Sequence, residues 1–204
     1  MGPLLIGVLL VLGFVLLVVL VIGGMGVGIY NRLVALRNDF KNQFAQIDVQ
    51  LKRRHDLIPN LVETAKGYMA HERGTLDEVV AARNGAVAAR QQASGDPTDP
   101  GAVQKVAAAE GVLSQSLGRL FAVAEAYPNL KANETMLQLQ NQLTDTENQI
   151  SLARQAYNES VRNYNTQREI FPNTILAGMF NFAPASLYEI TDPGEREVPK
   201  VSFS

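Results

Sequence analysis

The chain has 204 residues, a formal net charge of −2, two histidines and neither cysteine nor tryptophan. This balanced charge provides no basic field for nucleic acid, and without cysteine there is no disulfide and no thiolate chemistry. The ~170 residues that follow the apolar N-terminal segment are enough for one domain with its own core.

The first 31 residues carry no charged side chain, and 17 of the 19 residues from Leu4 to Ile22 are Leu, Ile, Val or Phe. A helix of this length crosses a hydrocarbon layer of ~30 Å. A cleaved secretory signal is the alternative, but no Lys or Arg precedes the apolar run and no A-x-A-like site follows it. We therefore predict a retained transmembrane anchor over 1-29, in contact with the lipid bilayer through residues 4-27.

Basic residues follow the anchor on its C-terminal side, at Arg32, Arg37 and Lys41. Because cytoplasmic loops carry an excess of Lys and Arg, this charge predicts a single-pass protein with its N-terminus outside and its body in the cytoplasm. The Gly24-x-x-x-Gly28 pair at the end of the anchor either lets two anchors approach closely or forms a flexible exit from the membrane.

Apolar residues spaced three and four positions apart predict a first body helix over 30-66, continuous with the anchor. They are Leu33, Leu36, Phe40, Phe44, Ile47 and Leu51. Pro59 should kink this helix, because it lacks an amide donor and clashes with the preceding turn. Gly67 is expected to end it.

Three further helices are predicted, over 75-92, 100-127 and 133-171. The first of them begins with a capping box, Thr75-Leu-Asp-Glu78. In the second, Asp99 is the expected N-cap and Pro100 the first helical residue. Pro128 follows its end, because the residue before a proline disfavours helix.

The last helix carries a heptad repeat, which is typical of a coiled-coil seam. Its members are Met136, Leu143, Ile150, Tyr157, Tyr164 and Phe171. We therefore predict an all-α fold, with an antiparallel up-down four-helix bundle over 30-172 whose first and fourth helices are long. An apolar segment and an acidic tail follow over 173-204.

Because the first and fourth helices run antiparallel from the membrane, the helical rise predicts which residues meet. Phe44 falls opposite Tyr157. Two polar contacts are predicted in the same way: Asp48 with Arg154, and Arg53 or Arg54 with Glu147.

The alternative for these charges is local pairing four residues apart, of Asp48 or Asp56 with Lys52. The full polar set offered for helix contacts or for partner binding is Asp48, Lys52, Arg53, Arg54, Asp56, Glu147, Asn148, Arg154, Tyr157, Asn158, Tyr164 and Asn165.

A short apolar patch follows the fourth helix and comprises Ile175, Leu176, Met179, Phe180 and Phe182. It is too short to cross a bilayer. Two readings stay open: the patch lies on the membrane surface, or it packs beneath the bundle.

The run from Ile47 to Val62 resembles the signature of the LemA family of bacterial membrane proteins. Further matches are Lys66-Gly-Tyr68, His71-Glu72, Ala82-Arg83, the run 125–133, Thr146-Glu-Asn148, Ala153-Arg154, Tyr157-Asn158 and Tyr164-Asn165. The resemblance implies a helical cytoplasmic domain on one N-terminal anchor in the bacterial inner membrane, with no established enzymatic activity. A related magnetosome membrane protein suggests a role in membrane organisation or assembly.

The residues offer little for catalysis. Neither histidine has the Glu-x-x-His spacing of di-iron bundles, and Thr75 stands where a zinc-protease motif starting at His71 needs its second histidine. His55 is expected to be exposed within its basic stretch. We predict no catalytic, cofactor-binding or metal site.

Two functions follow from these features. The first is a membrane-tethered, non-enzymatic scaffold or adaptor of the LemA type, which acts at the cytoplasmic face by protein-protein interaction or self-association. Its partners would be unknown membrane or cytoplasmic proteins, or further copies in a homo-oligomer. The alternative is a membrane-organising, remodelling or quality-control component that uses the apolar segment 175-182.

Overall fold

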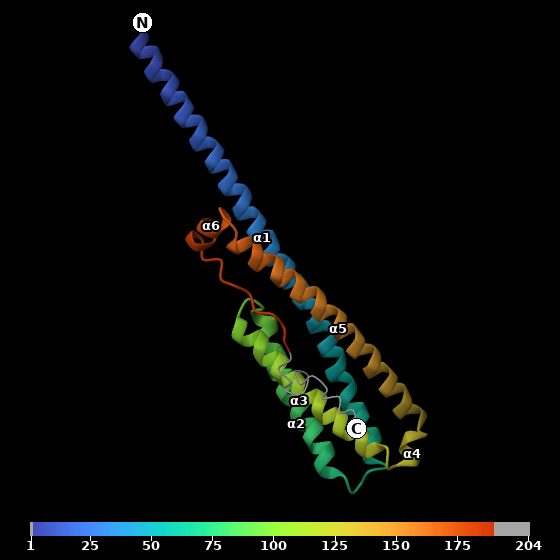
Figure 1. Cartoon of the computed structure of the whole chain (residues 1–204). Helices are drawn as coiled ribbons and strands as arrows, with labels where there is room; N and C mark the ends of the chain where they lie inside the picture. The colour runs from blue at the N-terminus through green and yellow to red at the C-terminus, as the bar shows by residue number, and fades with distance from the viewer. Residues whose placement is uncertain (1, 190–204) are drawn as a thin grey trace, which may run out of the picture. The chain divides into compact units, whose positions relative to one another are not determined.

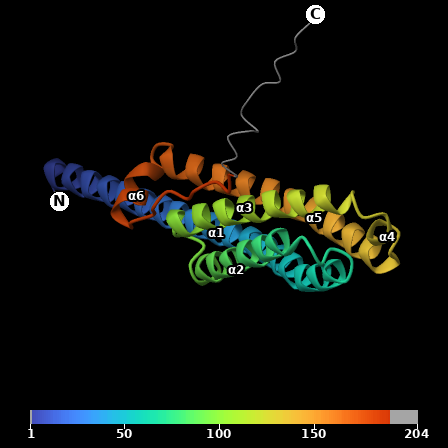
Figure 2. The same cartoon turned by 90° about the horizontal axis from the view of Figure 1, so that it is seen from below.

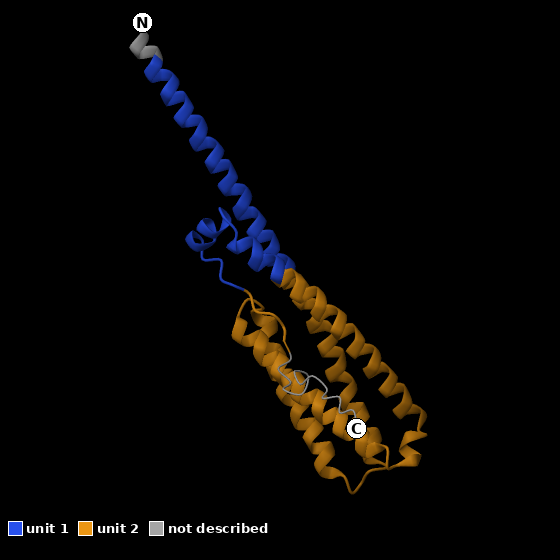
Figure 3. Cartoon of the chain, in the orientation of Figure 1, with its two compact units in different colours: residues 1–39, 162–184 blue, residues 40–161, 185–204 orange. Residues whose placement is uncertain are grey.

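The computed structural model describes residues 2–189, and within them all regular structure is helical. The helices, shown in Figure 1 and turned by 90° in Figure 2, are α1 (Pro3–Lys66), α2 (Arg73–Gly95), α3 (Pro100–Ala124), α4 (Pro128–Lys131), α5 (Glu134–Glu169) and α6 (Asn173–Met179). The chain forms two compact units, and α1 and α5 each contribute to both (Figure 3). The domain boundaries predicted at residues 29 and 172 stay predictions.

The first unit comprises residues 1–39 and 162–184. Its part of α1 contains an apolar stretch that is long enough to cross a membrane, with a mean hydropathy of 3.1 and 0% of it buried. The residues that follow α6 pack against the end of this stretch, where the Tyr30 ring lies 4.9 Å from that of Phe180 and 5.6 Å from that of Phe182. In the same unit the Tyr164 hydroxyl donates to the carbonyl of Ala183 at 2.8 Å.

The second unit comprises residues 40–161 and 185–204. Its apolar core takes side chains from α1 to α5, among them Leu61, Val79, Leu117, Leu130 and Leu139. Burying a side chain of this size contributes about 1.5–3 kcal/mol, so this core is the main source of stability. The predicted opposition of Phe44 and Tyr157 is confirmed, since their ring centroids lie 5.7 Å apart.

Two of the predicted helix ends are confirmed and one is wrong. α1 ends at Lys66, just before Gly67, and the Asp99 side chain accepts from the amide of Gly101 at the start of α3. The capping box is wrong: α2 already begins at Arg73, and its N-cap makes no side-chain hydrogen bond. Glu78, whose carboxylate was expected to reach back along the helix, instead pairs with Arg119 of α3 at 2.9 Å.

The heptad prediction holds along α5 except at its last member. Met136, Leu143, Ile150, Tyr157 and Tyr164 are buried. Phe171, by contrast, is 79% exposed, because α5 ends at Glu169 and the next residues leave the helical stripe.

α1 continues without interruption through Pro59. Proline cannot donate to the carbonyl four residues earlier, so the oxygen of His55 loses its usual partner within the helix. Arg83 of α2 supplies a replacement, because its Nε donates to that oxygen at 2.9 Å. The hydrogen bond that Pro59 removes from α1 is thus replaced by one from α2.

Candidate functional site

A cluster of ionisable side chains lies inside the second unit, where α1 faces α3. Arg54, His55 and Glu110 are 4%, 2% and 2% exposed. Nη1 of Arg54 donates to Oε2 of Glu110 at 3.0 Å, and Nε2 of His55 lies 2.6 Å from Oε1 of the same carboxylate. Nη2 of Arg54 donates to Oγ of Ser114 at 2.7 Å and lies 3.3 Å from Oε2 of Glu147. Glu110 thus bridges two residues of α1.

The apolar stripes of the two helices bring this cluster together. Arg54 and His55 lie one turn beyond buried Leu51, and Glu110 lies between buried Val106 and Leu113 of α3. The prediction that His55 is exposed is therefore wrong, because the position belongs to the buried face of α1. Sequence reasoning also missed Glu110, although a lone carboxylate on an apolar stripe predicts a buried partner.

The contacts predicted between α1 and α5 are partly confirmed. Arg54 meets Glu147 as expected, whereas Arg53 and Asn148 are exposed. The prediction that Asp48 contacts Arg154 is wrong.

Asp48 instead accepts from Nη1 of Arg90 at 2.8 Å and from the hydroxyl of Ser94, both of which belong to α2. The expectation compared only α1 with α5 and left out α2. The local alternative is confirmed in one case: Lys52 pairs with Asp56 at 2.8 Å. The hydrogen bond from Lys52 lowers the pKa of Asp56.

The tyrosine and asparagine pairs of α5 hold the C-terminal segment of their own chain. In the second unit, the Tyr157 hydroxyl donates to the carbonyl of Ser186 at 2.9 Å. The side-chain amide of Asn158 bonds both backbone groups of Tyr188, accepting from its N–H at 2.8 Å and donating to its C=O at 3.2 Å. Asn165 is half-buried.

Tyr188 is the buried end of this docked segment. Its side chain is 1% exposed, and the guanidinium of Arg154 lies 5.3 Å from its ring centroid. Its hydroxyl makes no hydrogen bond with the residues that the structure describes. Burial raises the pKa of both Tyr188 and Tyr157, because it disfavours the phenolate. Sequence reasoning missed Tyr188.

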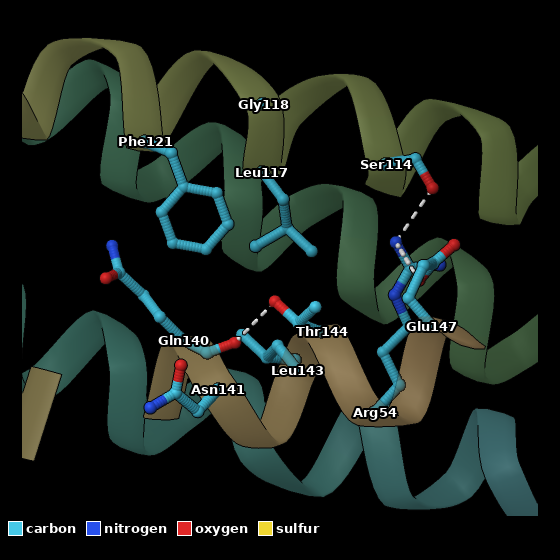
Figure 4. A pocket seen from close by; sticks show the side chains of 10 residues that line it. All are labelled: Arg54, Ser114, Leu117, Gly118, Phe121, Gln140, Asn141, Leu143, Thr144 and Glu147. Carbon is cyan, nitrogen blue, oxygen red and sulfur yellow. Dashed lines mark hydrogen bonds and ion pairs between the residues drawn. The ribbon is translucent and has the colours of Figure 1, made fainter. Parts of the chain in front are cut away.

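A cavity of about 570 Å³ opens beside this cluster of ionisable side chains (Figure 4). Arg54, Ser114 and Glu147 lie at one end of it, and Phe121 and Gln140 line the other. The guanidinium at its polar end is already paired with two carboxylates, so little charge is left for an incoming anion. Among residues 2–189, no group of three His, Asp or Glu side chains could hold a metal ion.

The LemA family profile matches residues 43–203. The chain belongs to the LemA family. Among its relatives are Magnetosome protein MamQ 2 and Magnetosome protein MamQ 1 of Paramagnetospirillum magneticum, each 26% identical over 184 residues, with 83% of this chain and 68% of the relative covered. Magnetosome protein MamQ of Magnetospirillum gryphiswaldense is 25% identical with the same coverage. Family and relatives, together with the apolar part of α1, indicate a membrane-associated protein.

The apolar patch of this LemA-family chain divides into outward and inward residues. Ile175, Met179 and Phe180 are 54%, 69% and 53% exposed, whereas Leu176 is half-buried and Phe182 is 6% exposed. Phe182 packs within the first unit, against Tyr30. Contact of the three outward residues with lipid stays a prediction.

Proposed function

We propose that the protein is a membrane-tethered, non-enzymatic scaffold whose helical body recruits proteins, or further copies of itself, at the cytoplasmic face. One observation carries this proposal. Val49 is 57% exposed, and Arg53, four residues later on the same face of α1, is exposed as well. Arg54, by contrast, is buried and paired with Glu110. An aliphatic side chain beside an unburied arginine provides both apolar contact and a bidentate donor for a partner's carboxylate.

The body that presents this face is inferred to be an antiparallel four-helix bundle. Two contacts support that arrangement of α1 and α5 within the second unit: Phe44 with Tyr157, and Arg54 with Glu147. The residue numbers add up to 201 in both pairs, as they do when two helices of equal rise run in opposite directions. Such a bundle holds the Val49 and Arg53 face on a rigid element.

The test is a pull-down of the full-length protein from solubilised membranes, with mass spectrometry of what it retains. Val49→Ala/Arg53→Ala is expected to lose partners that the wild type keeps. Arg73→Ala, which removes an exposed arginine at the start of α2, is the matched control. Partners that survive Val49→Ala/Arg53→Ala, or that are lost equally with Arg73→Ala, contradict the proposal.

A second candidate is a membrane-organising role for residues 175-182, and the exposure of Ile175, Met179 and Phe180 favours it. The chain has no tryptophan, so Met179→Trp gives a single tryptophan on α6, which can be excited selectively over the tyrosines. In bilayers of brominated phosphatidylcholine its emission should be strongly quenched. Leu152→Trp, at a residue of the second unit that is 58% exposed, should not be quenched. Equal emission from the two variants contradicts this role.

A further inference from the structure

An apolar groove lies in the first unit between α1 and α6. It has a volume of about 390 Å³ and is lined by Gly23, Gly26, Val27, Tyr30, Leu176, Met179 and Phe180. The two glycines leave room beside α1: a Cβ at Gly26 would lie 4.0 Å from Leu176, and one at Gly23 would meet nothing within 4 Å. Apart from the Tyr30 hydroxyl, no lining side chain has a polar atom.

The groove lies on the last turns of the predicted membrane span. The uncharged run of the chain continues to Asn31, and Arg32 is its first charged residue. The α1 residues of the groove all precede that charge, so at this depth the groove opens toward acyl chains. A flexible hydrocarbon chain matches both its lining and its surroundings.

A cation lies next to the groove on the side of the charged residues. The guanidinium of Arg37 is 5.2 Å from the centroid of the Phe182 ring, which also contacts Tyr30 of the groove. Nε of Arg37 is buried and has no hydrogen-bond partner among residues 2–189. Arg37 follows Tyr30 by seven residues, which places it roughly 10 Å further along α1. That step is comparable to the depth of a headgroup layer.

We propose that the first unit binds one anionic phospholipid, with an acyl chain in the groove and the headgroup phosphate at Arg37. The inference rests on the second candidate function, because it needs α6 at the bilayer, and it adds a defined site and a headgroup preference. The alternative occupant of the groove, the α1 helix of a second copy, is one outcome of the test.

The test uses the full-length protein reconstituted in phosphatidylcholine bilayers that contain a minor fraction of phosphatidylglycerol. Native mass spectrometry after release from the bilayer counts the phosphatidylglycerol molecules and the protein copies that stay together. Gly26→Phe fills the groove, and Gly28→Phe, a glycine outside it, is the matched control. Arg37→Gln removes the headgroup contact, and Arg32→Gln removes an exposed arginine nearby.

We expect the wild type to retain one phosphatidylglycerol. Arg37→Gln should lower that retention about fivefold, the effect of one cation at a membrane surface. Gly26→Phe should lower it as well, because its ring occupies the space of the acyl chain. The double variant Gly26→Phe/Arg37→Gln should retain less lipid than either single one, because each substitution removes a different contact with the same lipid. Gly28→Phe and Arg32→Gln, both outside the proposed site, should retain lipid like the wild type.

Equal losses in Gly26→Phe and Gly28→Phe would overturn the proposal, as would equal losses in Arg37→Gln and Arg32→Gln. A dimer that Gly26→Phe dissociates, with no change in bound lipid, would assign the groove to a second copy and also overturn it. If Met179→Trp is quenched by brominated lipid and no phosphatidylglycerol is retained, the lipid site fails while the membrane role of α6 stands. If neither is seen, both fail.

Discussion

Removing the charge of Glu110 is the sharpest perturbation that the structure offers. Glu110→Gln keeps the shape of the side chain, but it leaves the guanidinium of Arg54 buried with one remaining carboxylate. That carboxylate belongs to Glu147, whose side chain is 49% exposed and lies 3.3 Å away. Breaking a buried ion pair by removing one partner costs about 3–5 kcal/mol, because the other charge stays desolvated. We expect a loss of this size.

Neighbouring substitutions give the scale for that loss. Ser114→Ala removes one hydrogen bond from Arg54 and should cost about 1 kcal/mol. Glu147→Gln removes a half-exposed partner and should cost at most about 1 kcal/mol. Arg54→Met/Glu110→Leu removes both buried charges, so it should be far less destabilised than the sum of its single variants, with a coupling of about 2 kcal/mol or more.

The assay is urea unfolding of the full-length protein in detergent micelles, followed by far-ultraviolet circular dichroism at neutral pH. The reasoning is refuted if Glu110→Gln lies within about 1 kcal/mol of Ser114→Ala, or if the coupling between Arg54 and Glu110 is near zero. Either result would mean that the two charges are hydrated in the folded protein.

Three further predictions concern the same unit and the same unfolding assay. Arg83→Ala should cost about 1–3 kcal/mol, because the carbonyl that Pro59 leaves open then lacks a donor; no loss would contradict this. Asp99→Ala should lower the free energy of unfolding by about 1 kcal/mol through the lost N-cap, and an unchanged free energy would mean that the cap does not stabilise α3. Burial raises the pKa of Tyr157 and Tyr188, so the folded state keeps protons that the unfolded state releases, and stability should fall as the pH rises above 10.0. Tyr188→Phe, which loses no hydrogen bond within residues 2–189, should reduce that fall without destabilising the protein at pH 7, whereas Tyr157→Phe should cost about 1 kcal/mol there; equal costs would contradict this account.

The register between α1 and α5 could be predicted because two long helices of fixed rise leave few choices of height. Phe44 with Tyr157 and Arg54 with Glu147 both follow from it. The partner of Asp48, by contrast, could not be predicted from the register of α1 and α5. This partner, Arg90, lies on α2, and the rotation of α2 depends on a turn whose conformation leaves no pattern in the sequence.

The remaining site residues differ in how far they were predictable. Glu110 carries a usable signal, since it interrupts an apolar stripe. Tyr188 carries none, because it lies in a segment without periodicity and is held by hydrogen bonds to its backbone, for which every residue type except proline provides both groups. The division of residues 175-182 into buried and exposed side chains could not be predicted from the sequence. In the structure Phe182 is buried and Met179 is exposed.

The proposed scaffold function requires the helical body to lie on the cytoplasmic side of a membrane, and cysteine labelling tests this requirement most directly. The chain has no cysteine, so Gly2→Cys and Asn60→Cys, both at exposed positions, each give a single thiol. A membrane-impermeant maleimide is added to spheroplasts before and after permeabilisation. The account predicts that Gly2→Cys is labelled in intact spheroplasts and Asn60→Cys only after permeabilisation. Labelling of Asn60→Cys in intact spheroplasts would contradict it.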